Sequence, residues 1–253
     1  MPPAQLDFGY PWWLSYGHLI LAAATVAVLL LGYARKWSKG PMLLAGIVAL
    51  WSTAAFLVAR FVIDVNGQPL LPTQSFLHLG TGRVLDMGAG TGRSSIMVLA
   101  NRPQATLVAL DLFGDSFEQH FGRSGTPKQR LLTNLKAVGV EQRAMIQAGD
   151  MRNLPFEAAA FDAIVSSYAI DHLNREGINQ SLAEAARVLK PGGDFLLMVI
   201  TKEPWIQFTF GPLLLHGGTR GSAWWTQRLQ EAGFQVVEQG TRPITLYLLS
   251  RRG

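Results

Sequence analysis

The stretch Arg83-Val84-Leu85-Asp86-Met87-Gly88-Ala89-Gly90-Thr91-Gly92 decides the fold of this chain. A short apolar run containing one acid opens into three alternating glycines, which is typical of a buried β-strand followed by a tight turn. Glycines let the backbone approach a ligand closely, because a Cβ would block that approach. The sequence therefore predicts a nucleotide-binding turn after a strand of an α/β domain.

The spacing of the glycines distinguishes two kinds of cofactor. A dinucleotide fingerprint needs G-x-G-x-x-G, whereas here the third glycine is Gly92 and Arg93 follows it. Asp86 also disfavours a pyrophosphate, since a carboxylate beneath the loop would repel it. A ligand with an ammonium and a sulfonium meets no such repulsion. The loop therefore fits S-adenosylmethionine better than NAD.

Acids end two further predicted strands. The run from Thr106 to Asp111 is a second buried-type strand, and an acid at its end is placed to accept hydrogen bonds from a ribose diol. A third strand begins at Ala144 and ends with Asp150, whose carboxylate suits an adenine amino group. A fourth, Phe161 to Tyr168, ends at a small polar rim followed by an aromatic side chain.

The rest of the domain shows clear signals for where helices end and strands begin. A helix is predicted from Asn174 to Leu189, and Lys190-Pro191-Gly192-Gly193 stops it before a fifth strand, Asp194 to Ile200. A helix over Ser222–Ala232 precedes two closing strands, Phe234–Glu238 and Ile244–Ser250. We expect these two to form an antiparallel hairpin at one sheet edge. The last run is the more apolar, as expected for a covered strand.

From about Arg83 to the C-terminus, roughly two thirds of its length, the chain resembles the class I S-adenosylmethionine-dependent methyltransferases. The matching motifs are Leu85-Asp86-Met87-Gly88-Ala89-Gly90-Thr91-Gly92, Asp111, Gly149-Asp150-Met151 with Leu154-Pro155-Phe156, and Arg187-Val188-Leu189-Lys190-Pro191-Gly192-Gly193. The resemblance implies a Rossmann-like α/β fold, with a mostly parallel seven-stranded sheet and helices on both faces. It also implies S-adenosyl-L-methionine as the methyl donor.

The resemblance assigns roles to individual residues. Asp86 and the glycine loop would hold the methionine portion, Asp111 the ribose hydroxyls, and Asp150 with the Met151 backbone the adenine. The predicted cofactor-binding residues in full are Asp86, Gly88, Ala89, Gly90, Gly92, Asp111, Leu112, Gly149, Asp150, Met151 and Ser166. In the alternative interpretation, the acids only cap the following helices and the glycines only make turns.

Two apolar runs precede this domain, Leu14–Tyr33 and Met42–Ala59, and neither contains Asp, Glu, Lys or Arg. Some 20 residues at about 1.5 Å rise match the ~30 Å of hydrocarbon in a bilayer. Aromatic residues near the ends suit a membrane interface. A signal peptide fits poorly, because no basic region precedes the first run. We expect residues 1–63 to be a membrane-anchoring helical hairpin, 64–81 a linker and 82–253 the cofactor-binding domain. The alternative is a hairpin buried on the soluble domain or in a dimer contact.

The orientation of such an anchor involves two opposing arguments. Arg35, Lys36 and Lys39 lie between the runs, and the positive-inside rule would place them in the cytoplasm. Two full spans would then leave the catalytic domain outside, away from a cytosolic cofactor. We expect the catalytic domain to face the cytoplasm. A shallow hairpin whose basic loop meets anionic lipid head groups reconciles both arguments.

Composition excludes several function classes. A net charge of +5 without a basic run interleaved with aromatics indicates attraction to anionic lipid, and we expect no nucleic-acid partner. The chain has no cysteine, which excludes disulfides, thiolate metal sites and cysteine nucleophiles, and we expect no metal.

Two apolar segments lie where this fold builds its acceptor pocket, after Asp111 (residues 112–122) and after the fifth strand (residues 204–216). Unless the second simply packs on the sheet, it covers a ligand or dips into lipid. We therefore expect a hydrophobic acceptor, such as a quinone ring or a lipid head group. The alternatives are a membrane-tethered binding module without catalysis and a methyltransferase of a soluble acceptor.

Methyl transfer from a sulfonium needs alignment and exclusion of water, and a base only where the acceptor loses a proton. The candidate catalytic residues are His172 for a phenolic or enolic proton, Asp171 for an amine, and Tyr168 at the boundary between cofactor and acceptor. His120 and His216 are weaker candidates in the apolar segments.

Overall fold

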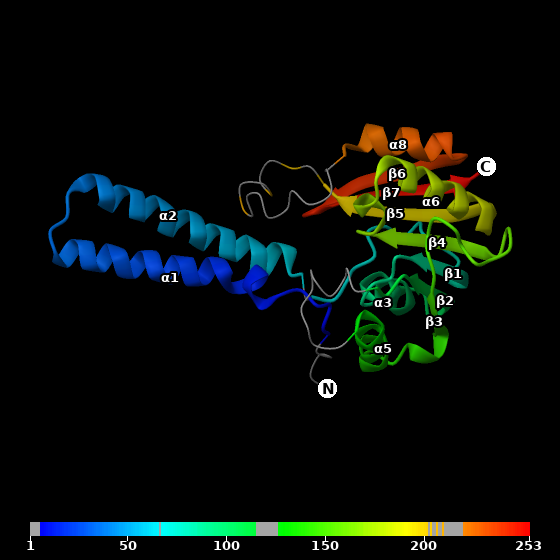
Figure 1. The fold of residues 1–253 in the computed structure, drawn as a ribbon, viewed down its shortest axis with the longest axis horizontal. Coiled ribbons are helices and arrows are strands. Elements are labelled where there is room, and N and C mark those ends of the chain that lie inside the picture. Colours follow the sequence, from blue (N-terminus) through cyan, green and yellow to red (C-terminus); the bar gives the residue numbers. More distant parts are fainter. Residues whose placement is uncertain are drawn as a thin grey trace. The chain divides into compact units, whose positions relative to one another are not determined.

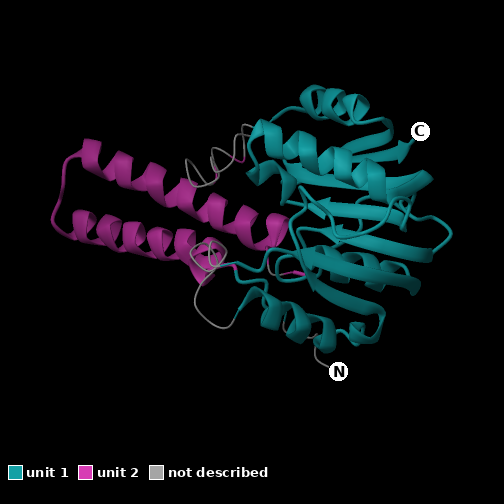
Figure 2. Ribbon diagram, turned by 45° about the vertical axis from the view of Figure 1, so that its right-hand side comes forward, with its two compact units in different colours: residues 1–9, 68–203, 215–253 teal, residues 10–67, 204–214 magenta. Residues whose placement is uncertain are grey.

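The structure, a computed structural model, describes residues 6–65, 67–114, 126–201, 203, 206, 209 and 220–253. The chain divides into two compact units, which Figure 2 colours separately. The α/β unit lies within residues 1–9, 68–203 and 215–253, and the hairpin unit within residues 10–67 and 204–214.

The α/β unit is built on one seven-stranded sheet in the order β3-β2-β1-β4-β5-β7-β6 (Figure 1). Its strands are β1 Thr81–Met87, β2 Gln104–Asp111, β3 Ala144–Ala148, β4 Phe161–Ser167, β5 Leu189–Ile200, β6 Phe234–Arg242 and β7 Thr245–Arg252. Neighbours from β3 through β5 pair in parallel, whereas β7 is antiparallel to both β5 and β6. The mostly parallel sheet and the closing antiparallel hairpin are confirmed, and the apolar last strand is covered on both sides, as predicted.

Several strand boundaries differ from the predicted ones, and β6, for example, ends at Arg242 and not at Glu238. β3 ends at Ala148, and Asp150 lies beyond it in an isolated bridge with Asn153. β5 begins at Leu189, not at Asp194, because Leu189 already pairs with Phe161. The pairing register of β4 and β5 shifts after Phe161, so the Pro-Gly-Gly sequence forms an irregularity within the strand and not a stop before it.

Helices cover the sheet, and two of them begin at side-chain caps. They are α3 Arg93–Asn101, α5 Pro127–Ala137, α6 Arg175–Val188 and α8 Ser222–Glu231, with short 3-10 turns η2 Glu141–Arg143 and η3 Ile170–His172. Asn174 caps α6 by accepting from the Gly177 amide, and Thr126 with Gln129 forms a capping box on α5. The core cluster joins α6 and α8 to alternate residues of the strands, including Leu85, Ile164 and Leu197. α3 and α5 contact each other, and α3 also contacts β2 and β4.

The segment before β1, predicted to be a linker, is fastened to the α/β unit. Phe76 is fully buried, and the Leu77 amide donates to Asp194 Oδ2 at 2.8 Å. The buried guanidinium of Arg102 donates to the Phe76 carbonyl at 2.9 and 2.7 Å and to the Gln74 carbonyl at 2.8 Å. The backbone of residues 74–77 is therefore fixed by buried side chains of the sheet and of the end of α3.

The hairpin unit contains α1 Trp12–Ala34 and α2 Lys39–Leu57, which continues as the π-helical turn η1 Val58–Ile63. Both helices are long and apolar enough to cross a membrane, with mean hydropathy of 2.0 and 2.2. Only 11% and 22% of their most apolar windows are buried. Their buried residues are all small, namely Ser15, Ala22 and Gly32 in α1, and Ala49, Ser52 and Ala55 in α2.

We expect Arg102→Ala to destabilise the α/β unit, because the buried Phe76 carbonyl and the Gln74 carbonyl lose their donors. The loss of several charge-assisted hydrogen bonds should lower the free energy of unfolding by about 2–4 kcal/mol. Urea unfolding in detergent measures this quantity. Arg175→Ala, at the exposed start of α6, is the control and should change stability by less than about 0.5 kcal/mol. Equal effects of the two changes would contradict this role of Arg102.

Candidate functional site

The glycine loop after β1 has a backbone that other residues tolerate poorly. Gly88, Gly90 and Gly92 have φ values of +83°, +51° and +91°, in the left-handed region that favours glycine. A Cβ on Gly88 would lie 2.3 Å from the Ala169 Cβ and 3.0 Å from the Met151 Cε. The loop is therefore packed between the segments that follow β3 and β4, and a side chain at Gly88 would separate them.

Asp86 lies beneath this loop and is fully buried. Ser94 Oγ lies 2.8 Å from each carboxylate oxygen, and Ser95 Oγ donates to Oδ2 at 2.5 Å. Burial raises the pKa of Asp86 from 3.8 to about 7, although the hydrogen bonds from Ser95 and Ser94 oppose this shift. Asp86 thus joins the end of β1 to the first turn of α3 and exchanges its proton near neutral pH. The sequence predicted the acid but not its two serine partners.

Asp111, at the end of β2, bonds the glycine loop directly. Its Oδ2 accepts from the Gly90 amide at 2.9 Å, and its Oδ1 accepts from the Phe113 amide at 2.9 Å. The Asp111 carbonyl also accepts from the Gly149 amide at 3.0 Å. These bonds connect the ends of β1, β2 and β3. Each half-buried carboxylate oxygen keeps a lone pair, as a ribose diol requires. Leu112, the next residue, has an exposed side chain.

Asp150 and Met151 follow β3 and lie beside this connection. The Asp150 carboxylate forms an ion pair with Arg152 at 2.6 Å and accepts from the Arg152 amide at 2.8 Å. The hydrogen bonds from Arg152 lower the pKa of Asp150, so this carboxyl is ionised at neutral pH. Met151 is half-buried with its Cε near Gly88. Met151 therefore lies beside the glycine loop, whereas the Asp150 carboxylate is paired with Arg152.

Residues at the end of β4 divide into buried and exposed groups. Ser166 is buried and donates to the Met87 carbonyl at 2.8 Å, which ties β4 to β1. Tyr168 has φ +52°, and its hydroxyl hydrogen-bonds with the Thr245 hydroxyl. His172, predicted to act as a base, has an exposed side chain.

Asp171 lies in the turn η3, next to His172. Its Oδ1 is buried and has no hydrogen-bond partner among the residues that the structure describes. Burial raises the pKa of Asp171, and the positive charges of His172 and Arg220 only partly oppose this effect. The Arg220 guanidinium stacks on Trp224, 4.8 Å from the ring centroid. A buried carboxyl with a raised pKa near a charged partner is typical of functional sites.

Parts of the predicted site lie outside the residues that the structure describes. His120 and His216 are not among them, and neither is most of the two apolar segments 112–122 and 204–216. Over the described part of the chain, no three residues of the His, Asp and Glu types group in a way that could hold a metal ion.

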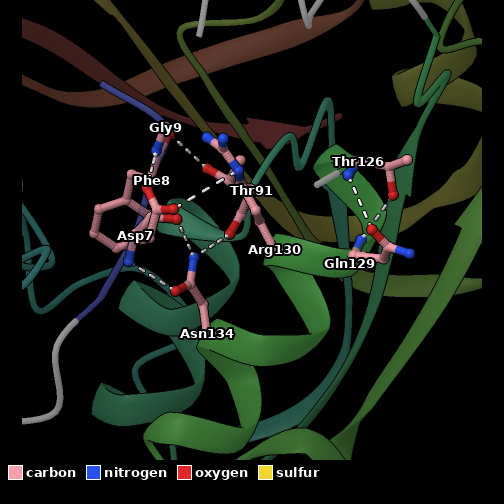
Figure 3. Close-up of polar contacts among 8 residues, drawn as sticks. All are labelled: Asp7, Phe8, Gly9, Thr91, Thr126, Gln129, Arg130 and Asn134. Carbon is pink, nitrogen blue, oxygen red and sulfur yellow. Dashed lines mark hydrogen bonds and ion pairs between the residues drawn. The ribbon is translucent and has the colours of Figure 1, made fainter. Parts of the chain in front are cut away.

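Sequence reasoning missed the residues that support the glycine loop from outside, Phe8 and Asn134. Asn134 is almost fully buried in α5 and donates to the Thr91 carbonyl at 2.9 Å (Figure 3). The only sequence signal was an uncharged polar residue on the apolar face of a predicted helix. Phe8 gave none, because it lies before the first apolar run.

Known proteins share this architecture. Residues 84–193 match a family described as "Methyltransferase domain". The ubiquinone/menaquinone biosynthesis C-methyltransferase of Bartonella tribocorum is 33% identical over 127 residues, which cover 49% of this chain and 44% of that protein. The malonyl-[acyl-carrier protein] O-methyltransferase of Methylococcus capsulatus is 28% identical over 174 residues, covering 66% of this chain and 58% of that protein. The chain thus spans about half the length of the curated relatives it matches.

The solved structures agree on the fold. An O-methyltransferase family protein from Burkholderia thailandensis superposes with a TM-score of 0.59 at 17% identity, covering 95% of this chain and 71% of that one. A strand-end glycine loop fixed by acids, the matching domain sequence and this superposition point in one direction. Residues 84–193 of this chain thus match a methyltransferase domain in sequence, and the fold is that of a solved O-methyltransferase family protein.

Proposed function

We propose that this chain is a membrane-anchored methyltransferase that transfers the methyl group of S-adenosyl-L-methionine to a hydrophobic, quinone-like or lipid-like acceptor. The observation that carries the proposal is the presence in one chain of a class I glycine loop and a helical pair with an almost wholly apolar exposed surface. The cofactor explains the first feature, and a membrane that dissolves the acceptor explains the second.

The residues present fit the cofactor. Asp111 offers a half-exposed carboxylate for a diol at the point where β1, β2 and β3 end. Met151 offers an apolar side chain beside Gly88. Asp86 is a buried acid below the loop, so a cationic amino-acid group above it would be attracted when the carboxyl ionises. We keep Asp150 and Gly149 as the adenine-side residues, with Leu112 and Ser166 at the rim.

The hairpin unit has the features of helices in lipid. Small residues form its buried interface, as in membrane helix pairs, where close backbone approach replaces the hydrophobic effect. The hydroxyls of Thr25, Ser52 and Thr53 donate to carbonyls of their own helices, so they need no water. Large apolar side chains such as Leu30 and Leu50 are 66% and 75% exposed. Of the predicted anchor, residues 1–63, the first nine belong to the α/β unit, so we propose helices α1 and α2 with η1 as the anchor, together with a cytoplasmic catalytic domain. The basic turn at Arg35 would then contact anionic lipid.

The names of the relatives guide the choice of acceptor. Several are ubiquinone/menaquinone biosynthesis C-methyltransferases, and one is a malonyl-[acyl-carrier protein] O-methyltransferase. A quinone ring is an apolar molecule that resides in membranes, which fits the anchor of this chain. A cofactor-binding module without catalysis would not need the buried Oδ1 of Asp171, which has no hydrogen-bond partner among the described residues.

The chemistry then divides among a few residues. S-adenosylmethionine supplies an activated methyl group, so the chain's own task is to align the acceptor and to exclude water. As the acceptor–methyl bond forms and the sulfur–methyl bond breaks, an acceptor carbon or hydroxyl must release a proton. We assign that proton to Asp171, because its carboxyl is buried and basic, whereas His172 is exposed. Tyr168, held by Thr245, lines the boundary between cofactor and acceptor.

Cofactor binding should be linked to the proton on Asp86. Below about pH 7 this carboxyl is protonated in the folded protein. An ammonium group nearby favours the ionised form, so S-adenosylhomocysteine should bind more tightly as the pH rises through about 7, with release of a proton. Calorimetry in buffers of different ionisation enthalpy measures both effects.

Asp86→Asn should weaken binding and remove the difference in proton release. The control is Asp162→Asn, which changes an acid at the start of β4 that is paired with Lys190 at 2.6 Å. Affinity and proton release should stay as in the wild type for this variant. Unchanged proton release in Asp86→Asn would show that the Asp86 carboxyl does not respond to the ligand. Absence of binding in the wild type would refute the proposed function.

Asp171→Asn should lower the rate of methyl transfer from labelled donor to a membrane lipid extract by about 100-fold, the usual contribution of a positioned base. In the wild type, the rate should rise with pH through the raised pKa of Asp171, because only the carboxylate accepts a proton. The variant should lose this rise. A larger loss in His172→Ala than in Asp171→Asn would assign the base to His172 instead.

The full-length protein should float with lipid vesicles and stay bound at high salt, because apolar insertion is not screened. Leu30→Arg together with Leu50→Arg should reduce flotation, since each charge within the bilayer costs about 2.5–3.5 kcal/mol. The matched surface change is Leu132→Arg in α5, which is 41% exposed in the α/β unit and should leave flotation unchanged. Recovery of the wild type in the aqueous fraction would refute membrane anchoring.

A further inference from the structure

The residues that precede the first apolar helix dock on the glycine loop of the α/β unit. Figure 3 shows Asp7, Phe8 and Gly9 lying across Thr91 and α5. Phe8 is 1% exposed, and its carbonyl accepts from the Thr91 hydroxyl at 3.1 Å. The Arg93 guanidinium lies over the Phe8 ring, 5.1 Å from its centroid. A phenyl ring buried this fully, only a few residues from a helix of the other unit, is a fixed part of the fold and not a free end.

Asn134 joins this segment to the loop by using its whole side-chain amide. Its Nδ2 donates to the Asp7 carbonyl at 2.8 Å and to the Thr91 carbonyl at 2.9 Å. Its Oδ1 accepts from the Asp7 amide at 3.0 Å. An amide offers two N–H donors and an oxygen acceptor, so each group has a partner. No other side chain of this size supplies the same set at a buried position.

Asp7 completes the local structure with weaker contacts. Its Oδ1 accepts from the Gly9 amide at 2.8 Å, which shapes the turn. Its Oδ2 lies 3.7 Å from Arg130 Nε, but the Asp7 side chain is 61% exposed and this ion pair contributes little. The contacts that hold the segment are therefore the buried Phe8 ring and the Asn134 amide.

We propose that Asp7-Phe8-Gly9, termed the strap, positions the glycine loop for the methyl donor. The proposal rests on the proposed function, since it concerns the affinity for S-adenosylmethionine. The strap fixes the side chain and the carbonyl of Thr91, which lies between Gly90 and Gly92. These glycines have the most backbone freedom to lose, so an external hold on Thr91 reduces the conformational cost of binding.

The strap also connects the loop to the anchor. Only Tyr10 and Pro11 separate Gly9 from Trp12, the first residue of α1. At about 3.5 Å per residue, this connection reaches at most about 11 Å. The anchor's first helix and the cofactor loop are therefore joined by one short covalent segment, in addition to the chain that leads from α2 to β1. The strap makes donor affinity sensitive to the chain that precedes the anchor.

Calorimetry with S-adenosylhomocysteine on the full-length protein in detergent tests the strap. In Phe8→Ala the loop should occupy its binding conformation only part of the time. A tenth of the time would lower the apparent affinity about tenfold. Phe8→Leu, which restores an apolar side chain, should recover most of the affinity. Under saturating donor, both variants should reach the wild-type rate, because the strap touches no reacting atom.

The control for a general loss of stability is Thr126→Ala on the same helix. Thr126 Oγ1 accepts from the Gln129 amide at 3.2 Å and makes no contact with the strap among those drawn in Figure 3. Its loss should lower the free energy of unfolding by about 1 kcal/mol, with the affinity for S-adenosylhomocysteine unchanged.

Asn134→Asp supplies a pH-dependent version of the test. A carboxylate at this buried position would face the carbonyls of Asp7 and Thr91 and repel them, whereas a protonated carboxyl donates to one of them. The variant's affinity relative to the wild type should therefore recover as the pH falls. Wild-type affinity in both Phe8→Ala and Asn134→Asp would overturn the strap. Absence of binding in the wild type itself would instead reject the proposed function.

Discussion

The left-handed backbone of the glycine loop is the constraint on which the rest of the α/β unit depends. With positive φ at Gly88, Gly90 and Gly92, the chain turns from β1 into α3 within a few residues. The turn exposes the Gly90 amide to Asp111 and leaves room for Ala169 and Met151 at Gly88. The ends of the central strands thus meet around a loop, Gly88–Gly92, in which three of five residues have no side chain. Ligand specificity then comes from what surrounds the turn: acids below it and beside it, and an apolar methionine.

Burial makes the ionisation of Asp86 sensitive to a charge placed nearby. The folded protein buries this carboxyl away from water, and its side-chain hydrogen-bond partners are two serine hydroxyls. Its raised pKa means that ionisation is costly until a cation arrives. Burial also raises the pKa of Asp171, which follows β4. The proposed function assigns Asp86 to the methyl donor and Asp171 to the acceptor.

Much of this could be predicted from sequence because local signals and global fold agree. The acid–glycine pattern, the apolar strand runs and the order of the motifs along the chain predicted the sheet and its closing antiparallel hairpin. The errors have physical causes: Leu189 joins β5 through pairing with Phe161, a distant contact that a Pro-Gly-Gly signal conceals. Asn134 and Phe8 escaped notice for a similar reason. Their partners lie 43 and 83 residues away in sequence, so no local pattern reveals them.

The two units differ in the kinds of side chain that they bury and expose. The α/β unit buries Phe76, Phe161 and Trp225, whereas the hairpin unit buries small residues and exposes large apolar ones. Under the proposed function, such a chain would place a methyl donor beside a membrane. The most direct measurement is mass spectrometry of lipids and quinones after cells make either the wild type or Gly88→Val, whose side chain would collide with Ala169. We predict that the wild type alone adds a methyl group to a hydrophobic molecule. Identical extracts from the two kinds of cell would contradict the account.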